Sequence, residues 1–335
     1  MALNAVTQKT VDNDEAGMRL DRWFKQHFPG LGFGRLQKLL RSGQVRIDGT
    51  RAKTSTRLEA GQLVRVPPLD DEASRPRYMT ANTIRDRADG DVLRDMLLFE
   101  DAKVLVFNKP SGLAVQGGSG INRSVDSMLE ALRDKSGQKP RLCHRLDRDT
   151  SGVLVVAKTR GAAAALTGSF RHRDTRKTYW ALVRGVPRHQ QGRISTYLVK
   201  EQTPEGDRMR VAQHGERGAD HAVSTYRLID SGPRSVSWLE MSPHTGRTHQ
   251  LRVHAQHLGH PIIGDPKYFD VENWSLPGGV QKRLHLHARR LLIPHPDPQQ
   301  APIDVTAPLP PHMVQSWNLF GFDEADGLPL DDGSI

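Results

Sequence analysis

The chain contains a single cysteine, Cys143, among its 335 residues. One cysteine excludes an internal disulfide and any zinc site built on several thiolates. His144 follows it, but neighbours on an extended backbone point to opposite faces, which argues against a Cys–His catalytic pair. No apolar run approaches the roughly 20 residues of a membrane-spanning helix. The opening residues, MALNAVTQKT, also lack the apolar core of a signal peptide, so we expect a cytoplasmic protein.

Signatures of several enzyme classes are also absent. The fifteen histidines include five between His244 and His260, but no H-E-x-x-H motif occurs and their spacing does not repeat on one helical face. There is no G-x-S-x-G nucleophile elbow and no glycine-rich dinucleotide fingerprint. The glycine cluster at 117–120 is not followed by a Walker lysine, which favours a flexible loop over a phosphate cradle. We therefore expect neither a metal nor a cofactor.

Acidic side chains are too few to balance the basic ones. The formal net charge is +10, and residues 15–66 hold eleven Lys and Arg against four Asp and Glu. A basic excess concentrated in one small part of a chain favours a polyanionic partner such as a nucleic acid. At 335 residues the chain exceeds the usual length of one domain, so two domains are expected.

The basic N-terminal region has a simple predicted architecture. Apolar side chains recur at helical spacing over residues 18–40, and Pro29 and Gly30 interrupt them, which predicts two short helices joined by a turn. The pair Asp48–Gly49 predicts a hairpin, and residues 63–66 predict a further strand. A basic helical face that merely keeps the protein soluble is the alternative to RNA binding. Four basic positions on the helices are the candidate RNA contacts: Arg22, Arg35, Lys38 and Arg41.

Segments without apolar periodicity set the predicted domain limits. Residues 1–14 are expected to form a loose arm, and residues 69–95, which are polar and charged, a linker. The last residues, 321–335, are acidic and are expected to be disordered. These limits leave a small domain at 15–68 and a larger one at 96–320.

The densest run of chemically active side chains lies at residues 142–158, LCHRLDRDTSGVLVVAK. Its second half, Val153–Ala157, is β-branched and apolar, which predicts a buried strand. Asp147 lies between Arg145 and Arg148 in the polar loop that precedes this strand. A carboxylate in such a position can act on a charged ligand, and a salt-bridged surface loop is the alternative.

The rest of the larger region alternates predicted strands and helices. Apolar runs at 97–99, 104–107 and 178–183 predict strands, and the Ala-rich segment 160–170 predicts a helix. Tyr179 lies in the last of these strands, where tyrosine is also common for packing alone.

Four blocks in this region resemble the RluA-type pseudouridine synthases, in the order of that family. The blocks are NKPSGLAVQGGSG at 108–120, HRLDRDTSGVLVVAK at 144–158, KTYWALVRG at 177–185 and TGRTHQLRVHAQHLGHPIIGD at 245–265. The segment RLDRWF…LQKLLRSGQVRIDG within residues 15–68 is similar to the S4 RNA-binding domain. The combination looks closest to the ribosomal large subunit pseudouridine synthase C group.

The resemblance implies an α+β protein. A small S4-like domain of two helices and a hairpin would be joined to a catalytic domain with a mixed, mostly antiparallel sheet, flanking helices and a central cleft. In that family Asp147 would be the nucleophile, Tyr179 would lie against the target base and Arg252 would pair with the catalytic carboxylate. Leu251 would pack under the base, and Arg145 would hold the target nucleotide out of its stack.

The function implied is the isomerisation of uridine to pseudouridine, with large-subunit ribosomal RNA as the expected partner. The rearrangement needs no redox step or group donor, which agrees with the missing cofactor motifs. No membrane and no obligate protein partner are implied. Two alternatives remain open: the same chemistry on tRNA or mRNA, and an RNA-binding or ribosome-assembly protein without activity.

Overall fold

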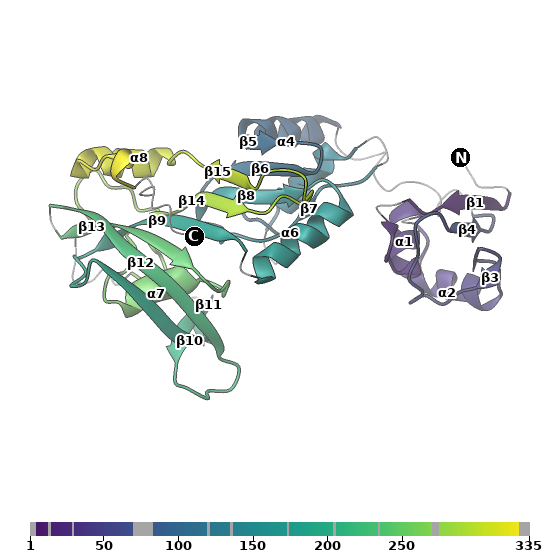
Figure 1. Cartoon of the computed structure of the whole chain (residues 1–335), viewed down its shortest axis with the longest axis horizontal. Helices are drawn as coiled ribbons and strands as arrows, with labels where there is room; N and C mark the ends of the chain where they lie inside the picture. The colour runs from purple at the N-terminus through teal and green to yellow at the C-terminus, as the bar shows by residue number, and fades with distance from the viewer. Residues whose placement is uncertain are drawn as a thin grey trace. The chain divides into compact units, whose positions relative to one another are not determined.

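The computed structural model describes residues 5–12, 15–28, 30–69, 83–118, 121–134, 137–172, 174–203, 206–233, 235–269 and 275–327. The chain divides into two compact units, residues 1–87 and residues 88–335 (Figure 1). In the described part of the chain, no helix is long and apolar enough to cross a membrane.

The N-terminal unit combines two short helices with a small antiparallel sheet, in which the strand order is β1-β4-β2-β3. Asp48 and Gly49 have φ angles of 46° and 78°, the left-handed pair that a tight hairpin turn requires. Trp23 and Phe24 on one helix and Leu36 on the other are buried in the core. The predicted helices and hairpin are therefore confirmed. The elements are β1 (Thr7–Thr10), α1 (Leu20–His27), α2 (Phe33–Arg41), β2 (Arg46–Ile47), β3 (Thr50–Arg51) and β4 (Leu63–Val66).

The C-terminal unit is built on one large sheet. Its strand order is β11-β10-β12-β13-β9-β14-β8-β6-β5, with β15 paired to β14 and β7 paired to β8. Among the described strands, only the β14–β8 pair is parallel, so the predicted mixed, mostly antiparallel sheet is confirmed. The strands are β5 (Leu97–Glu100), β6 (Val104–Lys109), β7 (Arg141–Leu142), β8 (Ser151–Ala157), β9 (Arg176–Arg184), β10 (Gln191–Thr203), β11 (Gly206–Ala212), β12 (Asp220–Gly232), β13 (Val236–Pro243), β14 (Leu286–Ile293) and β15 (Ile303–Thr306).

Helices cover this sheet because it is apolar on both faces near its centre. Every residue of β8 is buried, which explains its uninterrupted apolar sequence. Ala162 and Leu166 of α6 pack on one face, and Val125 and Met128 of α5 lie in the cluster on the other. The helices are α4 (Thr83–Asp95), α5 (Val125–Met128), α6 (Arg160–His172), α7 (Gln250–His257) and α8 (Pro311–Phe320), with 3₁₀ turns η2 (Leu129–Leu132) and η3 (Glu324–Gly327).

The structure corrects three of the expected irregular segments. The arm at 1–14 contains strand β1, which pairs with β4. The second half of the linker predicted at 69–95 forms helix α4, whose residue Leu93 is fully buried in the C-terminal unit. In the tail at 321–335, Phe322 is buried and residues 324–327 form η3. The remainder of these segments, residues 1–4, 13–14, 70–82 and 328–335, lies outside the described residues.

One glycine determines how closely the central strands approach. Gly152 has a φ angle of +111°, and a Cβ atom there would lie 2.2 Å from the carbonyl oxygen of Ala288 on β14. We expect Gly152→Ala to lower the free energy of unfolding by more than about 2 kcal/mol, because both the backbone conformation and the strand pairing resist the side chain. Gly168→Ala in α6, where no atom lies within 4 Å of the new Cβ, should raise it by up to about 1 kcal/mol. Urea titrations compare the two; equal stabilities would contradict the packing described.

Candidate active site

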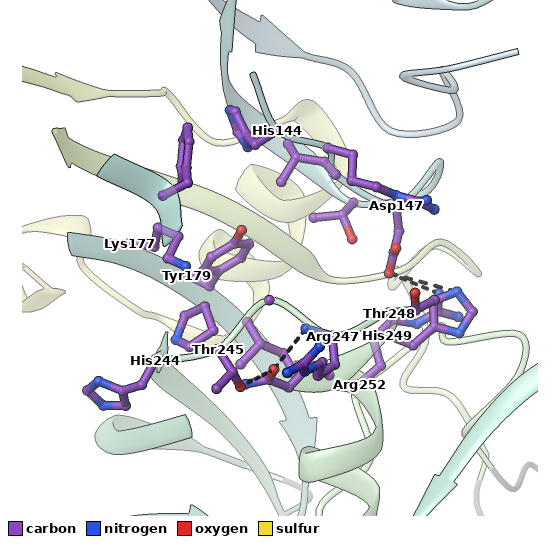
Figure 2. A pocket seen from close by; sticks show the side chains of 18 of the residues that line it. His144, Asp147, Lys177, Tyr179, His244, Thr245, Arg247, Thr248, His249 and Arg252 are labelled. Carbon is purple, nitrogen blue, oxygen red and sulfur yellow. Dashed lines mark hydrogen bonds and ion pairs between the residues drawn. The ribbon is translucent and has the colours of Figure 1, made fainter. Parts of the chain in front are cut away.

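A pocket of about 540 Å³ lies where the loop before β8, the start of β9 and the segment 243–252 meet (Figure 2). Sheet topology explains the meeting, because Ala288 of β14 pairs with Gly152 on one side and with Tyr179 on the other. Two strand spacings, about 10 Å, therefore separate the two neighbouring strands on either side of β14. The pocket is lined by all five residues predicted for the catalytic domain: Arg145, Asp147, Tyr179, Leu251 and Arg252.

Asp147 is partly exposed to the pocket, with 19% of its side chain accessible. Its Oδ2 atom lies 3.5 Å from Nη1 of Arg252 and 3.9 Å from Nε2 of His249 (Figure 2). Among the described residues, Oδ1 has no hydrogen-bond partner. One carboxylate oxygen thus faces the guanidinium of Arg252 and the imidazole of His249, while the other is available to a bound molecule.

The fully buried side chain of Lys109 stabilises the loop that carries Asp147. Its ammonium group donates to the carbonyl oxygens of Pro110 at 2.9 Å, Leu113 at 2.9 Å and Arg148 at 3.0 Å. Ser111 Oγ donates to the Asp149 carbonyl at 2.8 Å. Hydrogen bonds therefore hold the loops at 109–113 and 144–149 together beside the pocket.

Burial makes Lys109 sensitive to pH near neutrality. It lowers the pKa of Lys109 to about 7, against the opposing effect of Asp149 and Asp147. The unfolded chain keeps this proton to about pH 10. Between these values the unfolded state binds more protons, so this group makes the free energy of unfolding rise with pH.

Replacing Lys109 should remove that pH dependence. We expect the free energy of unfolding of the wild type, relative to that of Lys109→Met, to increase by up to about 2 kcal/mol between pH 7 and pH 9. Urea titrations at the two pH values measure this difference. Lys103→Met, at a lysine whose side chain is 41% exposed, is the matched control. A stability difference for Lys109→Met that does not change between pH 7 and pH 9 would contradict the lowered pKa of Lys109.

Arg252 is almost fully buried and is held by a partner in the same helix-and-turn segment. Its Nε and Nη2 atoms donate to Oδ2 and Oδ1 of Asp265 at 2.7 and 2.8 Å. The guanidinium also lies over the ring of Tyr268, 5.1 Å from its centroid. This bidentate geometry uses two of the donor groups and leaves Nη1 directed at Asp147.

Gln250, the first residue of α7, fixes the turn that precedes the helix. Its amide nitrogen donates to the carbonyl of Val223 and to Oγ of Ser224, each at 2.8 Å. Its side-chain carbonyl oxygen accepts the hydroxyl of Thr245 at 2.6 Å and the backbone N–H of Arg247 at 3.1 Å. Every polar atom of this buried amide is used, which holds the 245–250 turn against the sheet.

Tyr179 faces the pocket from β9, across from Asp147 and His249 in Figure 2. Burial, together with the nearby charge of Asp147, raises the pKa of Tyr179 well above its ordinary value. Its hydroxyl therefore keeps its proton near neutral pH and acts first as a donor. Among the described residues it has no hydrogen-bond partner, so it is available to a molecule in the pocket.

His144, which also lines the pocket, has a structural role. Its Nε2 accepts the backbone N–H of Val155 at 2.9 Å, and its ring stacks on Phe170 at 4.4 Å. Burial, with Lys177 nearby, lowers the pKa of His144 to about 3, so the ring is neutral. Burial raises the pKa of the adjacent Cys143 to about 11, which removes any nucleophilic role at neutral pH.

The other predicted residues divide between the two units. Arg145 is exposed and Leu251 is buried, and both line the pocket. Arg148 is exposed, 3.8 Å from Asp149, and does not line the pocket. The candidate RNA contacts of the N-terminal unit are all exposed on α1 and α2: Arg22, Arg35, Lys38 and Arg41.

Comparison with known proteins accords with this geometry. Residues 103–257 match the family described as RNA pseudouridylate synthase. A ribosomal large subunit pseudouridine synthase C of Salmonella typhimurium is 39% identical over 292 residues, which cover 84% of this chain and 87% of that protein. The chain belongs to the RNA pseudouridylate synthase family. The protein of the same description from Escherichia coli is 38% identical over 85% of this chain and 88% of its own length.

A solved structure supports the family fold. The human protein described as RNA pseudouridylate synthase domain containing 4 superposes with a TM-score of 0.58 and 30% identity, covering 71% of this chain and 97% of that one. Family membership makes the chain an enzyme, a pseudouridine synthase of the isomerase class. The expected family and enzyme class are therefore confirmed.

The prediction from sequence left out four residues that shape the site: Lys109, His249, Asp265 and Tyr268. Lys109, His249 and Asp265 lie inside the blocks that carry the family resemblance, so their position was a usable signal. Asp265 in particular follows the apolar run at 261–264, where a lone carboxylate needs a partner. Tyr268 lies outside the blocks, and the sequence carries no signal for its contact with His249.

Proposed function

We propose that this pseudouridine synthase acts on uridine in large-subunit ribosomal RNA, with Asp147 as its catalytic nucleophile. The observation that carries the proposal is the Asp147 carboxylate, which has Oδ2 toward Arg252 and His249 and Oδ1 open to a pocket of about 540 Å³. The names of the curated relatives from Salmonella typhimurium and Escherichia coli support the choice of large-subunit RNA.

The reaction is an isomerisation in which only a proton is exchanged with solvent. The bond from C1′ of the ribose to N1 breaks, the base turns, and a new bond joins C1′ to C5; C5 then loses its proton, and N1 carries one in the product. Asp147 either bonds to C1′ through Oδ1 or removes a ribose proton to give an unsaturated sugar. Both routes need an ionised carboxylate, and the guanidinium of Arg252 lies 3.5 Å from its Oδ2 atom.

Tyr179 and Leu251 would hold the base while it turns. The ring of Tyr179 offers a stacking surface, and its protonated hydroxyl offers a donor or a proton relay. Leu251, which is buried and lines the pocket, provides an apolar floor that does not bind one orientation of the base tightly. Rotation within the pocket is easier when most contacts are non-directional.

The target uridine must leave its stack before it can enter the pocket, at a cost of a few kcal/mol. Arg145 is exposed at the pocket, and its planar guanidinium suits the gap that the nucleotide leaves. Arg145 is two residues before Asp147, so the same loop carries both side chains.

We also propose that the N-terminal unit is an S4-like RNA-binding domain. Its helix–helix–hairpin order and its exposed basic residues on α1 and α2 support this role. We expect Lys38→Ala to weaken RNA binding several-fold and to reduce the slope of log K against log salt by about 1. Filter binding over a salt series measures both quantities. Lys53→Ala, in the loop after β3, is the control; an unchanged slope for Lys38→Ala would remove Lys38 from the RNA contact.

Substrate choice separates the main proposal from its alternatives. Tritium release from RNA that carries [5-³H]uridine reports every C5 proton lost. We expect release from large-subunit RNA transcripts and little from tRNA, small-subunit RNA or mRNA transcripts. Release from tRNA or mRNA alone would redirect the enzyme to that RNA, and binding without release from any RNA would favour a non-catalytic assembly protein.

A further inference from the structure

His249 has an unusual place beside the carboxylate of Asp147. Its backbone has φ 52° and ψ 18°, a left-handed conformation at the residue that precedes α7. This conformation is uncommon for a residue other than glycine and directs the ring back over the pocket. Nε2 lies 3.9 Å from Oδ2 of Asp147, and Nδ1 lies 2.8 Å from the hydroxyl of Tyr268.

The hydroxyl of Tyr268 determines which imidazole nitrogen carries the proton. Its oxygen accepts the backbone N–H of Met209 at 2.8 Å, so its own proton needs an acceptor. Among the described residues, the acceptor within reach is Nδ1 of His249. If Nδ1 carried the proton instead, the Tyr268 proton would have no acceptor there. Satisfying both groups therefore leaves the imidazole proton on Nε2, which faces Asp147.

The surroundings keep this ring uncharged. Burial is the main cause that lowers the pKa of His249, and the nearby charges of Arg252 and Lys267 act in the same direction. Asp147 and Asp265 oppose them without reversing the shift. A neutral ring with a proton on Nε2 is a donor toward Asp147, whereas a charged ring would compete with Arg252 for the same oxygen.

We propose that His249 is a positioning residue whose Nε2–H, fixed by the hydroxyl of Tyr268, turns Oδ2 of Asp147 toward Arg252 and leaves Oδ1 to meet the ribose. The inference deepens the proposed function and rests on it. Nε2 lies 3.9 Å from Oδ2, an electrostatic contact longer than a hydrogen bond, and it adds to the 3.5 Å contact of Arg252 in defining the rotation of the carboxylate. Two hydrogen bonds, from Met209 to Tyr268 and from Tyr268 to His249, and one longer electrostatic contact thus connect a backbone amide of β11 to Asp147.

The first test is the protonation state of the ring. In the full-length protein labelled with ¹⁵N-histidine, the His249 signal, assigned by its loss in His249→Asn, should show a protonated Nε2 and a bare Nδ1 at pH 7.5. Tyr268→Phe should convert part of this signal to the other tautomer. Tyr197→Phe, at a β10 tyrosine outside the pocket, should leave it unchanged. A wild-type signal with the proton on Nδ1 would overturn the inference.

The second test is kinetic. We expect Tyr268→Phe and His249→Asn each to lower kcat about 10-fold with KM within about twofold, because they misplace the nucleophile without removing base contacts. The double variant should be no slower than His249→Asn alone, because both substitutions act on Asp147 through the ring of His249. His249→Gln, whose amide nitrogen reaches the Nε2 position, should recover part of kcat, whereas equal activity of the Gln and Asn variants would contradict the donor role.

These results also separate the inference from the proposal beneath it. If Asp147→Asn abolishes turnover while Tyr268→Phe leaves kcat unchanged, the nucleophile stands and the positioning role of His249 fails. If Asp147→Asn retains turnover, the proposed function itself fails. Melting temperatures near that of the wild type show that each variant is folded. If the losses in kcat of the two single variants multiply in the double variant, Tyr268 and His249 act independently and the inference is wrong.

Discussion

We expect Asp147→Asn to lower the rate of pseudouridine formation by about 10,000-fold or more, while the protein still folds and binds RNA. The substitution keeps the size and shape of the side chain and removes its charge and nucleophilicity. The pocket residues that would hold the base, Tyr179 and Leu251, remain in place. Tritium release from [5-³H]uridine RNA under single-turnover conditions measures the rate, and filter binding measures the affinity.

The matched control is Asp149→Asn in the same loop. Asp149 lies two residues away, its side chain is directed to Arg148 at 3.8 Å, and it does not line the pocket. We expect this variant to keep the rate within about threefold, in line with the small value of exposed ion pairs. Comparable losses in both variants would mean that the charge of the loop, and not one carboxylate, is what the reaction needs.

Asp265→Asn has the largest expected effect on stability among the site variants. Asp265 is fully buried and makes two hydrogen bonds to the guanidinium of Arg252, which is itself only 3% exposed. Removing the negative charge leaves a buried cation without its partner, so we expect the free energy of unfolding to fall by about 3 kcal/mol. Without Asp265, Arg252 should also change its orientation relative to Asp147, and we expect this change to lower kcat.

A second Arg–Asp pair provides the control for Asp265→Asn. Arg290 and Asp304 form the same bidentate contact, with Nε to Oδ1 at 2.7 Å, but on the surface, where both side chains are at least one third exposed. Asp304→Asn should cost less than about 1 kcal/mol. Urea denaturation compares the two variants, and equal losses would show that burial does not set the strength of the Arg252–Asp265 pair.

The parts of the fold that the sequence predicted are those in which local pattern and burial agree. Strand β8 is buried at every position, and its apolar, β-branched sequence predicts a buried strand directly. The Asp48–Gly49 turn is predicted because few residue pairs adopt two left-handed conformations in succession. These features depend on the residues themselves, and tertiary context does not alter them.

The elements that the prediction missed depend on contacts far away in the sequence. Strand β1, TQKT, has no apolar alternation because it is an edge strand whose residues are mostly exposed. Helix α4 is polar along most of its length, and buried Leu93 is too small a signal to define a face. The tail is acidic, yet Gly327 lies against the rings of Trp180 and Trp238, where a side chain would not fit.

The same distinction applies to the site. Asp147, Tyr179 and Arg252 were predicted because each lies in a block with a family resemblance. Their bonding partners were not, because Asp265 and Tyr268 lie 13 and 19 residues along the chain from Arg252 and His249 and come into contact with them only through the tertiary fold. A sequence block identifies candidate site residues, whereas the structure shows which residues position them.

The most direct test of the central claim is a pseudouridine map of large-subunit ribosomal RNA in cells that lack this protein. We expect specific pseudouridines to be absent, to return when the wild-type gene is supplied, and to stay absent when the gene for Asp147→Asn is supplied at equal protein level. Return of these pseudouridines with Asp147→Asn would contradict the assignment of Asp147 as the nucleophile. An unchanged map in cells without the protein would contradict large-subunit RNA as its substrate.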